Sequence, residues 1–131
     1  MHFIGIDIGT TSICGVIYDF LHRRTESINV SNESGIAAGN SWEKIQDPQW
    51  IVTCVMQIIK KFESKYRGIK GIGVTGQMHG IVYLDKDGKA VSPLYTWQDN
   101  RGNLILHNNI TYAGFLTDHS GYNLSTGYGL V

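Results

Sequence analysis

Residues 3–18 read FIGIDIGTTSICGVIY, and this stretch decides the fold class. Two apolar runs, residues 3–8 and 13–18, flank the short polar link GTTS at residues 9–12. Apolar, β-branched runs bounded by glycine and hydroxyl residues are typical of strands, so the stretch predicts a β-hairpin. Asp7 is the only charged residue of the first run, and such a run predicts a strand that is buried on both faces.

The segments after the hairpin predict a third strand, a loop and a long helix. Residues 25–34 have a weaker strand pattern, and residues 35–41, which contain glycine and serine, are expected to form a loop. Asp47 suits the N-cap of a helix, and Pro48 suits its first position. Because apolar residues then recur at spacings of three and four, we expect a helix from about residue 48 to residue 66.

Past this helix the pattern returns to strands. Residues 69–76 read IKGIGVTG and predict another buried strand, which runs into a glycine-rich turn. Residues 81–84 predict a further strand, residues 85–88 a hairpin turn, and residues 99–119 a mixed, partly helical segment. This order of elements predicts an α/β fold, in which helices flank a mixed β-sheet.

Composition excludes several classes of protein. The 131 residues fit one ordinary domain, and 11 Lys and Arg balance 11 Asp and Glu. A neutral chain does not suit a general nucleic-acid binder, and no apolar run approaches the roughly 20 residues of a membrane span. The start of the chain lacks the basic region of a secretory signal, and Cys14 and Cys54 lack metal-ligand spacing. We therefore expect a cytoplasmic protein with reduced thiols and with no nucleic-acid or membrane partner.

Three clusters of polar residues can carry chemistry, and the first lies at the hairpin turn. Asp7 ends the first strand, where a buried carboxylate is costly unless it binds a positive group. Gly9 allows a ligand to approach closely, and Thr10 and Thr11 offer hydroxyl and N–H donors. Such a turn can hold a phosphoryl group while Asp7 holds hydrated Mg²⁺. The alternative is an ordinary hairpin in which Asp7 accepts hydrogen bonds from N–H groups of the turn.

The second cluster is Gln77-Met78-His79, which lies between two glycines at the end of a predicted strand. Strand ends are common ligand sites in α/β proteins. Gln77 and His79 can bind neutral hydroxyl groups, and Met78 offers an apolar wall. The alternative is a turn whose histidine is satisfied within the protein.

The third cluster is YTWQDNR at residues 95–101. The face of Trp97 suits the C–H side of a sugar, and Asp99 and Arg101 can clamp hydroxyl groups through several hydrogen bonds. The alternative is the start of a helix, with Asp99 as its cap and Arg101 on the solvated face.

In this order and spacing, the three clusters resemble the FGGY family of carbohydrate kinases, and the resemblance runs along nearly the whole chain. The stretch GIDIGTTS (residues 5–12) looks like the first phosphate hairpin of that family. GQMHG (76–80) looks like the sugar-contacting turn of its ketose kinases, xylulokinase among them, and WQDNR is similar to the W-x-D-x-R segment that follows. TGYG (126–129) looks most like the sedoheptulokinases of the family.

The resemblance implies an actin-like ATPase, ribonuclease H-like fold. It also implies a kinase that uses ATP and Mg²⁺ to phosphorylate a ketose of the sedoheptulose or xylulose type. By this resemblance Asp7 holds the water shell of the metal, and three residues of the turn face the phosphates: Gly9, Thr10 and Thr11. Five residues line the sugar: Gln77, Met78, His79, Asp99 and Arg101.

Members of the family are much longer than this chain. The resemblance therefore implies that residues 1–131 are the N-terminal part of the first of two domains, with the rest of that domain and the ATP-binding domain absent. No catalytic base is expected within the chain, because the resemblance places that aspartate beyond Val131. We expect the isolated chain to be inactive and to form homodimers through an exposed sheet edge or apolar surface. Two alternatives stay open: a non-catalytic sugar-binding or regulatory module of the same fold, and an unrelated actin-like ATPase fragment.

Overall fold

The computed structural model describes residues 1–128 and divides the chain into two compact units. The first unit comprises Met1–Ser34 and Gln49–Gln77, and the second comprises Gly35–Pro48 and Met78–Val131, described up to residue 128. The elements in chain order are β1 (His2–Ile8), β2 (Ser12–Asp19), β3 (Arg24–Ser31), β4 (Ile45–Gln46), α1 (Pro48–Lys65), β5 (Ile69–Gly76), β6 (Leu94–Tyr95), the 3₁₀ helix η1 (Arg101–Asn103), β7 (Ile105–His107), β8 (Ile110–Thr111) and α2 (Tyr112–Ser120).

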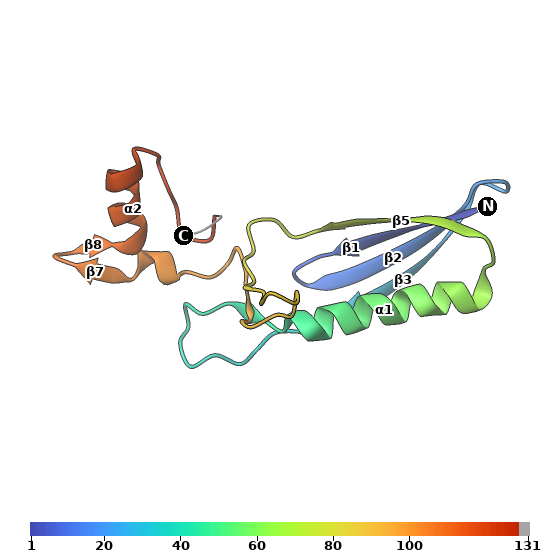
Figure 1. The fold of residues 1–131 in the computed structure, drawn as a ribbon, viewed down its shortest axis with the longest axis horizontal. Coiled ribbons are helices and arrows are strands. Elements are labelled where there is room, and N and C mark those ends of the chain that lie inside the picture. The colour runs from blue at the N-terminus through green and yellow to red at the C-terminus, as the bar shows by residue number, and fades with distance from the viewer. Residues whose placement is uncertain (129–131) are drawn as a thin grey trace. The chain divides into compact units, whose positions relative to one another are not determined.

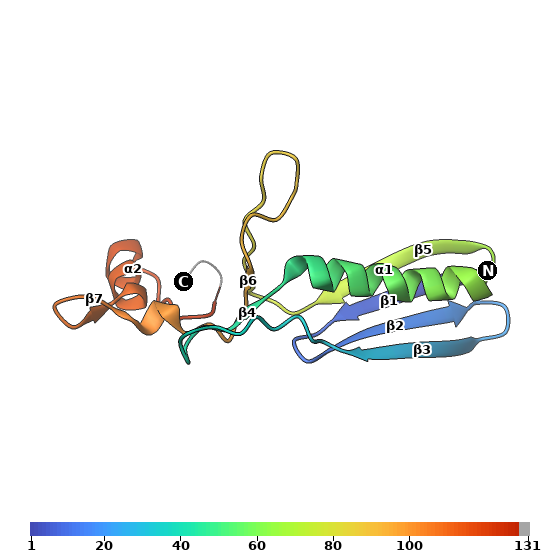
Figure 2. The same ribbon diagram turned by 90° about the horizontal axis from the view of Figure 1, so that it is seen from below.

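The first unit is built on a four-stranded sheet in the order β3-β2-β1-β5 (Figures 1 and 2). The predicted hairpin is present, since β1 and β2 pair antiparallel with Asp7 opposite Cys14. β3 pairs antiparallel with β2, which confirms the weaker strand expected at residues 25–34. β5 lies parallel to β1, with Thr75 beside Asp7, so the sheet is mixed as predicted.

α1 lies along one face of this sheet, as Figures 1 and 2 show, and it confirms the helix predicted from residue 48. Its buried residues follow spacings of three and four: Ile51, Cys54, Ile58 and Phe62. The sheet contributes four buried isoleucines to the core: Ile4, Ile6, Ile13 and Ile17. Gly15 of β2 allows the close contact between the two layers, because a Cβ there would lie 2.3 Å from Ile58 Cγ2.

The other face of the sheet differs from the sequence prediction. In β1 only Ile4 and Ile6 are buried, whereas Phe3 is 38% exposed, so the prediction of burial on both faces is wrong. Side chains alternate along a strand, and α1 covers only one face of β1 within residues 1–128. The prediction of a buried strand at residues 69–76 is also wrong. β5 is one of the two edge strands of the described sheet, and Val74 is 64% exposed.

The second unit contains two short antiparallel ladders, in which β4 pairs with β6 and β7 with β8. The strand predicted at residues 81–84 is wrong, because this segment forms only isolated bridges, from Ile81 to Tyr95 and from Leu84 to Ala90. The main-chain N–H of Tyr83 donates to the Ser92 hydroxyl instead of to a carbonyl of a partner strand, which interrupts the ladder. The predicted turn at residues 85–88 is present, with a φ of 78° at Gly88.

The segment at residues 99–119 is partly helical, as predicted, and contains η1 and most of α2. The Thr111 hydroxyl caps α2 by accepting a hydrogen bond from the Gly114 N–H, at 3.1 Å. Both cysteines are free thiols, and burial raises the pKa of Cys54. Across residues 1–128, none of the helices has the length and apolar character needed to cross a membrane.

Candidate functional site

The predicted phosphate turn is held by hydrogen bonds within the first unit. The Gly9 N–H donates to the Ser12 carbonyl at 2.9 Å, and a Cβ on Gly9 would lie only 2.8 Å from that oxygen. Asn32, just after β3, donates from its side chain to the Gly9 carbonyl (2.8 Å) and from its main chain to the Thr11 carbonyl (2.9 Å). Thr11 is exposed, and its hydroxyl has no protein partner within residues 1–128. The turn therefore presents a fixed main chain and an available hydroxyl to solvent.

Asp7 lies beside this turn, on the face of the sheet that α1 does not cover. It is exposed, which contradicts the expectation of a buried carboxylate at a strand end. In the described part of the chain its carboxylate accepts no hydrogen bond, so the alternative in which it caps the turn is also contradicted. It borders a hollow of about 420 Å³ whose lining includes Gly5, Cys14, Gly73 and Thr75.

The surroundings of Asp7 fit a hydrated Mg²⁺. Residues 1–128 contain no group of three or more His, Cys, Asp or Glu side chains that could hold a metal ion. Mg²⁺ differs from metals that need such a cage, because it usually keeps several waters and binds one or two carboxylates together with substrate phosphates. A solvent-facing carboxylate beside a phosphate turn suits that mode of binding.

Gln77 links the second cluster to the phosphate turn. Its main-chain N–H donates to the Ile8 carbonyl at 2.8 Å, directly after β5 ends at Gly76. The Thr10 hydroxyl donates to the side-chain oxygen Oε1 of Gln77 at 3.2 Å. Because β1 and β5 are parallel neighbours, their carboxyl ends meet at one edge of the sheet and bring these two distant segments together.

Met78 and His79 begin the second unit, and both are exposed. His79 has a φ of 63°, a left-handed conformation that is uncommon for residues other than glycine and recurs in strained turns at functional sites. Its ring lies against that of Tyr128, with the centroids 4.9 Å apart. The turn also packs on β6, since a Cβ at Gly80 would lie 2.9 Å from Leu94 Cδ1.

Asp99 and Arg101 form a hydrogen-bonded ion pair in the second unit. Asp99 is only 4% exposed, and its Oδ1 accepts from the main-chain N–H of Arg101 (3.2 Å) and from its Nε (2.6 Å). Oδ2 accepts from Arg101 Nη2 (3.1 Å) and from the Lys44 N–H (3.0 Å). Burial acts to raise the pKa of Asp99, but the hydrogen bonds from Arg101 and Lys44 outweigh it, so the pKa lies below its ordinary value. The carboxylate is therefore ionised at neutral pH.

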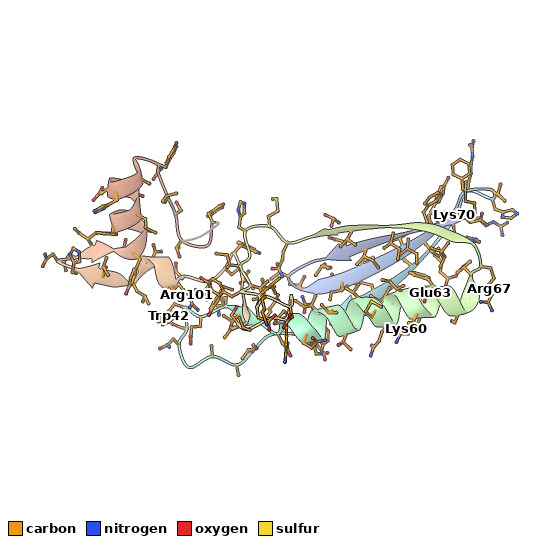
Figure 3. The ribbon with its side chains drawn as sticks, viewed as in Figure 1. Trp42, Lys60, Glu63, Arg67, Lys70 and Arg101 are labelled. Carbon is orange, nitrogen blue, oxygen red and sulfur yellow. The ribbon has the colours of Figure 1, made fainter. Side chains whose placement is uncertain are left out.

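Arg101 does not lie on a solvated helix face, as the alternative interpretation expected. Its guanidinium carbon is 4.3 Å from the ring centroid of Tyr95 and 5.6 Å from that of Trp42, and Figure 3 shows Trp42 and Arg101 close together. The residue at the N-cap of η1 is Asn100, which makes no side-chain capping bond, and the first N–H of η1, that of Arg101, is bonded to Asp99 Oδ1 instead.

The segment Thr126–Tyr128 contacts both clusters of the second unit. The Thr126 hydroxyl donates to the Asp99 carbonyl at 3.2 Å, and the Tyr128 ring lies against His79. A Cβ at Gly127 would lie 2.0 Å from the Trp97 carbonyl oxygen, so this position requires glycine. Gly129, the last residue of the TGYG motif, lies outside the described residues.

The predicted site residues thus fall into two groups, one in each unit. The first unit holds Asp7, the turn residues Gly9, Thr10 and Thr11, and Gln77; the second holds Met78, His79, Asp99 and Arg101. Sequence reasoning missed the supporting residues Asn32 and Trp42, and it gave no supporting role to Tyr95 or Tyr128, although both lie in motifs that it singled out. Asn32, Trp42 and Tyr128 act through contacts between segments that are far apart in the sequence, and no local signal marks such contacts.

Comparison with known proteins finds relatives among the xylulose kinases and a sedoheptulokinase. The xylulose kinase of Klebsiella pneumoniae is 30% identical to this chain over 105 residues, which are 76% of this chain and 20% of that protein. The sedoheptulokinase of Mus musculus is 26% identical over 152 residues, 96% of this chain and 30% of that protein. The crystal structure of a ligand-bound xylulose kinase from Lactobacillus acidophilus matches with a TM-score of 0.69 and 29% identity, over 78% of this chain and 21% of that one.

The chain therefore spans about a fifth of the length of most of the curated relatives it matches. Its structural neighbours are sugar kinases of the actin-like ATPase fold, which confirms the predicted α/β fold class. The model of the N-terminal domain of the FGGY carbohydrate kinases matches residues 2–131. On these grounds the chain belongs to the FGGY family of carbohydrate kinases, in which it matches the N-terminal domain.

Proposed function

We propose that this chain supplies the sugar-binding part, and one phosphate-binding turn, of a kinase that transfers the γ-phosphoryl group of ATP to a ketose hydroxyl. Xylulose and sedoheptulose are the two candidate substrates, because relatives with these specificities match the chain. The observation that carries the proposal is the hydrogen bond from the Thr10 hydroxyl to Gln77, which joins the phosphate turn to the start of the sugar cluster. A kinase needs these two binding functions side by side, because phosphoryl transfer depends chiefly on positioning and charge neutralisation.

On the phosphate side, the roles follow from the contacts of each residue. Gly9 packs against the Ser12 carbonyl and leaves no room there for a side chain. Without a side chain at this position, a phosphate can approach the main chain of the turn closely. The Thr11 hydroxyl faces solvent and donates to a phosphate oxygen, while Asn32 holds the turn in place. Asp7 would hold a hydrated Mg²⁺. When it is bound, Mg²⁺ supplies positive charge that neutralises the phosphates.

On the sugar side, the chain offers groups that suit a neutral polyol. Gln77 and His79 can donate to and accept from hydroxyl groups, and Met78, which is 73% exposed, offers an apolar surface. Asp99 and Arg101 contribute to the same function as a pair. No residue of the chain is assigned as the catalytic base, and we propose that this group lies beyond Val131.

The proposal also covers the cellular compartment of the reaction and the activity and association of the isolated chain. The reaction takes place in the cytoplasm, where ATP is available and where free thiols such as Cys14 and Cys54 stay reduced. Residues 1–131 alone do not turn over ATP. In isolation they associate into homodimers through the edge strand β5, which pairs only with β1 among the described residues.

The test is ketose-dependent release of ADP by the protein produced from its complete reading frame. We expect D-xylulose or sedoheptulose to stimulate ADP release in the presence of Mg²⁺. Asp7→Asn should abolish this turnover and leave ketose binding intact, because Asp7 acts on the metal. Asp87→Asn makes the same chemical change in an exposed turn and serves as the matched control.

Two results would contradict the proposal. Ketose binding without any ATP turnover by the complete protein would favour the non-catalytic sugar-binding module. Binding of neither ketose would contradict the proposal that xylulose or sedoheptulose is the substrate.

A further inference from the structure

The Asp99 carboxylate has no capacity left for a ligand. A carboxylate accepts about four hydrogen bonds, and the two oxygens of Asp99 already accept from Arg101 N–H, Arg101 Nε, Arg101 Nη2 and Lys44 N–H. The side chain is 4% exposed, so a sugar hydroxyl could reach it only by displacing one of these donors. Asp99 is thus placed to orient Arg101 and not to contact a sugar.

Arg101, unlike Asp99, has hydrogen-bond capacity left for a ligand, and part of its side chain is exposed. A guanidinium carries five N–H donors, and Asp99 takes two of them, one on Nε and one on Nη2. The remaining three have no protein acceptor within residues 1–128, and the side chain is 38% exposed. The ion pair with Asp99 and the contact with the Tyr95 ring at 4.3 Å fix the plane of the guanidinium. A planar set of free donors is therefore held at the surface.

The charge around Arg101 favours a neutral ligand. Asp99 balances its charge, and Glu43 is a second acidic group that acts on Arg101. A phosphate at this position would meet two carboxylates, whereas the hydroxyl and carbonyl oxygens of a sugar carry no charge to be repelled. The free N–H groups can donate to such oxygens but cannot accept from them.

We propose that Arg101 binds the sugar by donating hydrogen bonds to neutral ketose oxygens, and that Asp99, with the ring of Tyr95, is a positioning residue acting through Arg101. This assignment rests on the proposed function and refines it, because it divides between two residues a role that the sequence analysis gave to both. It also gives a role to Tyr95, for which the sequence pattern indicated none.

The test is a double-mutant cycle in the protein produced from its complete reading frame, with binding of D-xylulose and sedoheptulose measured by calorimetry. Arg101→Lys keeps the charge but loses the planar fork, and we expect it to weaken binding by about tenfold or more, the loss typical of a charge-assisted hydrogen bond. Asp99→Asn should have a similar effect. The double variant should bind no more weakly than Arg101→Lys, because Asp99 acts only through Arg101.

Controls separate this effect from damage to the fold. Arg24→Lys, at the exposed start of β3, makes the same chemical change and should bind as the wild type does. Tyr95→Leu removes the ring below Arg101 and should weaken binding, whereas Tyr95→Phe keeps the ring and should rescue it. In NMR spectra with labelled arginine, the Arg101 Nε–H signal should shift with ketose but not with inorganic phosphate. The melting temperature of each variant identifies any that fail to fold.

Three results would contradict the roles assigned to Arg101 and Asp99. Wild-type binding that is unchanged in Arg101→Lys would overturn this assignment and leave the proposed function intact. Losses that multiply in the double variant would show that Asp99 contacts the sugar itself, which also overturns it. Binding of neither ketose by the wild type would contradict the proposed function together with this inference.

Discussion

Asp19 shows how one side chain can make the stability of this fold depend on pH. It ends β2, accepts hydrogen bonds from the main-chain N–H groups of Leu21 and His22, and lies within hydrogen-bond distance of the His22 ring. The hydrogen bond with the His22 side chain is the largest cause that lowers the pKa of Asp19, from 3.8 to about 2. Ionised Asp19 therefore stabilises the folded state above its unfolded pKa, and this contribution is lost as the pH falls through about 2.

We expect Asp19→Asn to flatten the acid side of the stability profile. Melting temperatures measured from about pH 5 down to about pH 2 should fall more steeply for the wild type than for this variant, because only the wild type loses the Asp19 contribution. Asp118→Asn, on the exposed side of α2, makes the same change outside this network and should keep the wild-type slope. Parallel profiles for Asp19→Asn and the wild type would contradict the role assigned to Asp19.

The site residues that lie close together in the sequence were predicted best. Asp7, Gly9 and Thr11 follow one another along the chain, so their grouping at one turn needs only a hairpin. The burial of Asp7 was predicted wrongly, because burial depends on what covers each face of the sheet. The contacts of Arg101 with the rings of Trp42 and Tyr95 were not predicted, and Trp42 approaches it from a distant segment of the chain.

At the scale of elements, the contact between α1 and the sheet depends on Gly15. We expect Gly15→Ala to lower the free energy of unfolding by about 1–3 kcal/mol, because the new methyl group would overlap Ile58 in a packed core. Ile58 is β-branched and has little rotamer freedom with which to move aside. Chemical denaturation measures the difference.

Gly5→Ala is the matched control for this substitution. Gly5 lies on the neighbouring strand β1, and a Cβ there would have nothing within 4 Å. Its effect on the free energy of unfolding should be small. An equal loss for the two variants would show that backbone effects, and not the contact with α1, decide the cost.

In the second unit, Gly127 plays a similar part for the segment that contacts His79 and Asp99. Gly127 and Gly88 both have a φ of 78°, so an alanine is strained at either position. Only at Gly127 would the Cβ also lie 2.0 Å from a carbonyl oxygen, that of Trp97. Gly127→Ala should therefore lower the melting temperature more than Gly88→Ala does. Equal melting temperatures for the two variants would contradict the close packing of this segment.

Local patterns account for the elements that were predicted and for one that was missed. The β1–β2 hairpin and α1 each have a continuous apolar period, and both are found where they were expected. The hairpin of β7 and β8 was missed, although Asn108-Asn109 is the kind of pair that forms two-residue turns, and both residues have positive φ. The segment at residues 81–84 has a strand-like composition, but a hydrogen bond to the Ser92 hydroxyl interrupts its ladder.

At the scale of the whole molecule, β5 leaves an open sheet edge in the described chain. Ile72 and Val74 are 48% and 64% exposed on this strand, and an unpaired apolar edge favours association with a second copy. We expect light scattering to find dimers of the wild-type chain, residues 1–131, at high concentration. Val74→Lys should shift the population to monomers, because a charge on an edge strand opposes pairing.

The double variant Lys70→Val with Val74→Lys exchanges the two residues within β5, so the net charge of the chain is unchanged. It therefore serves as the control for net charge. This double variant should stay monomeric if the position of the charge matters. A wild-type chain that is monomeric at high concentration would contradict the proposed association.

The proposed function depends above all on ketose binding by the residues of the second and third clusters. Its most direct test is a titration of the ¹⁵N-labelled protein, produced from its complete reading frame, with D-xylulose and sedoheptulose, followed by NMR. We expect amide shifts that concentrate at residues 76–80, 99–101 and 126–128. The residues around Asp19 and His22, at the other end of β1 and β2 from the phosphate turn, should stay unchanged. Shifts confined to that other end, or no shifts with either sugar, would contradict ketose binding by these two clusters.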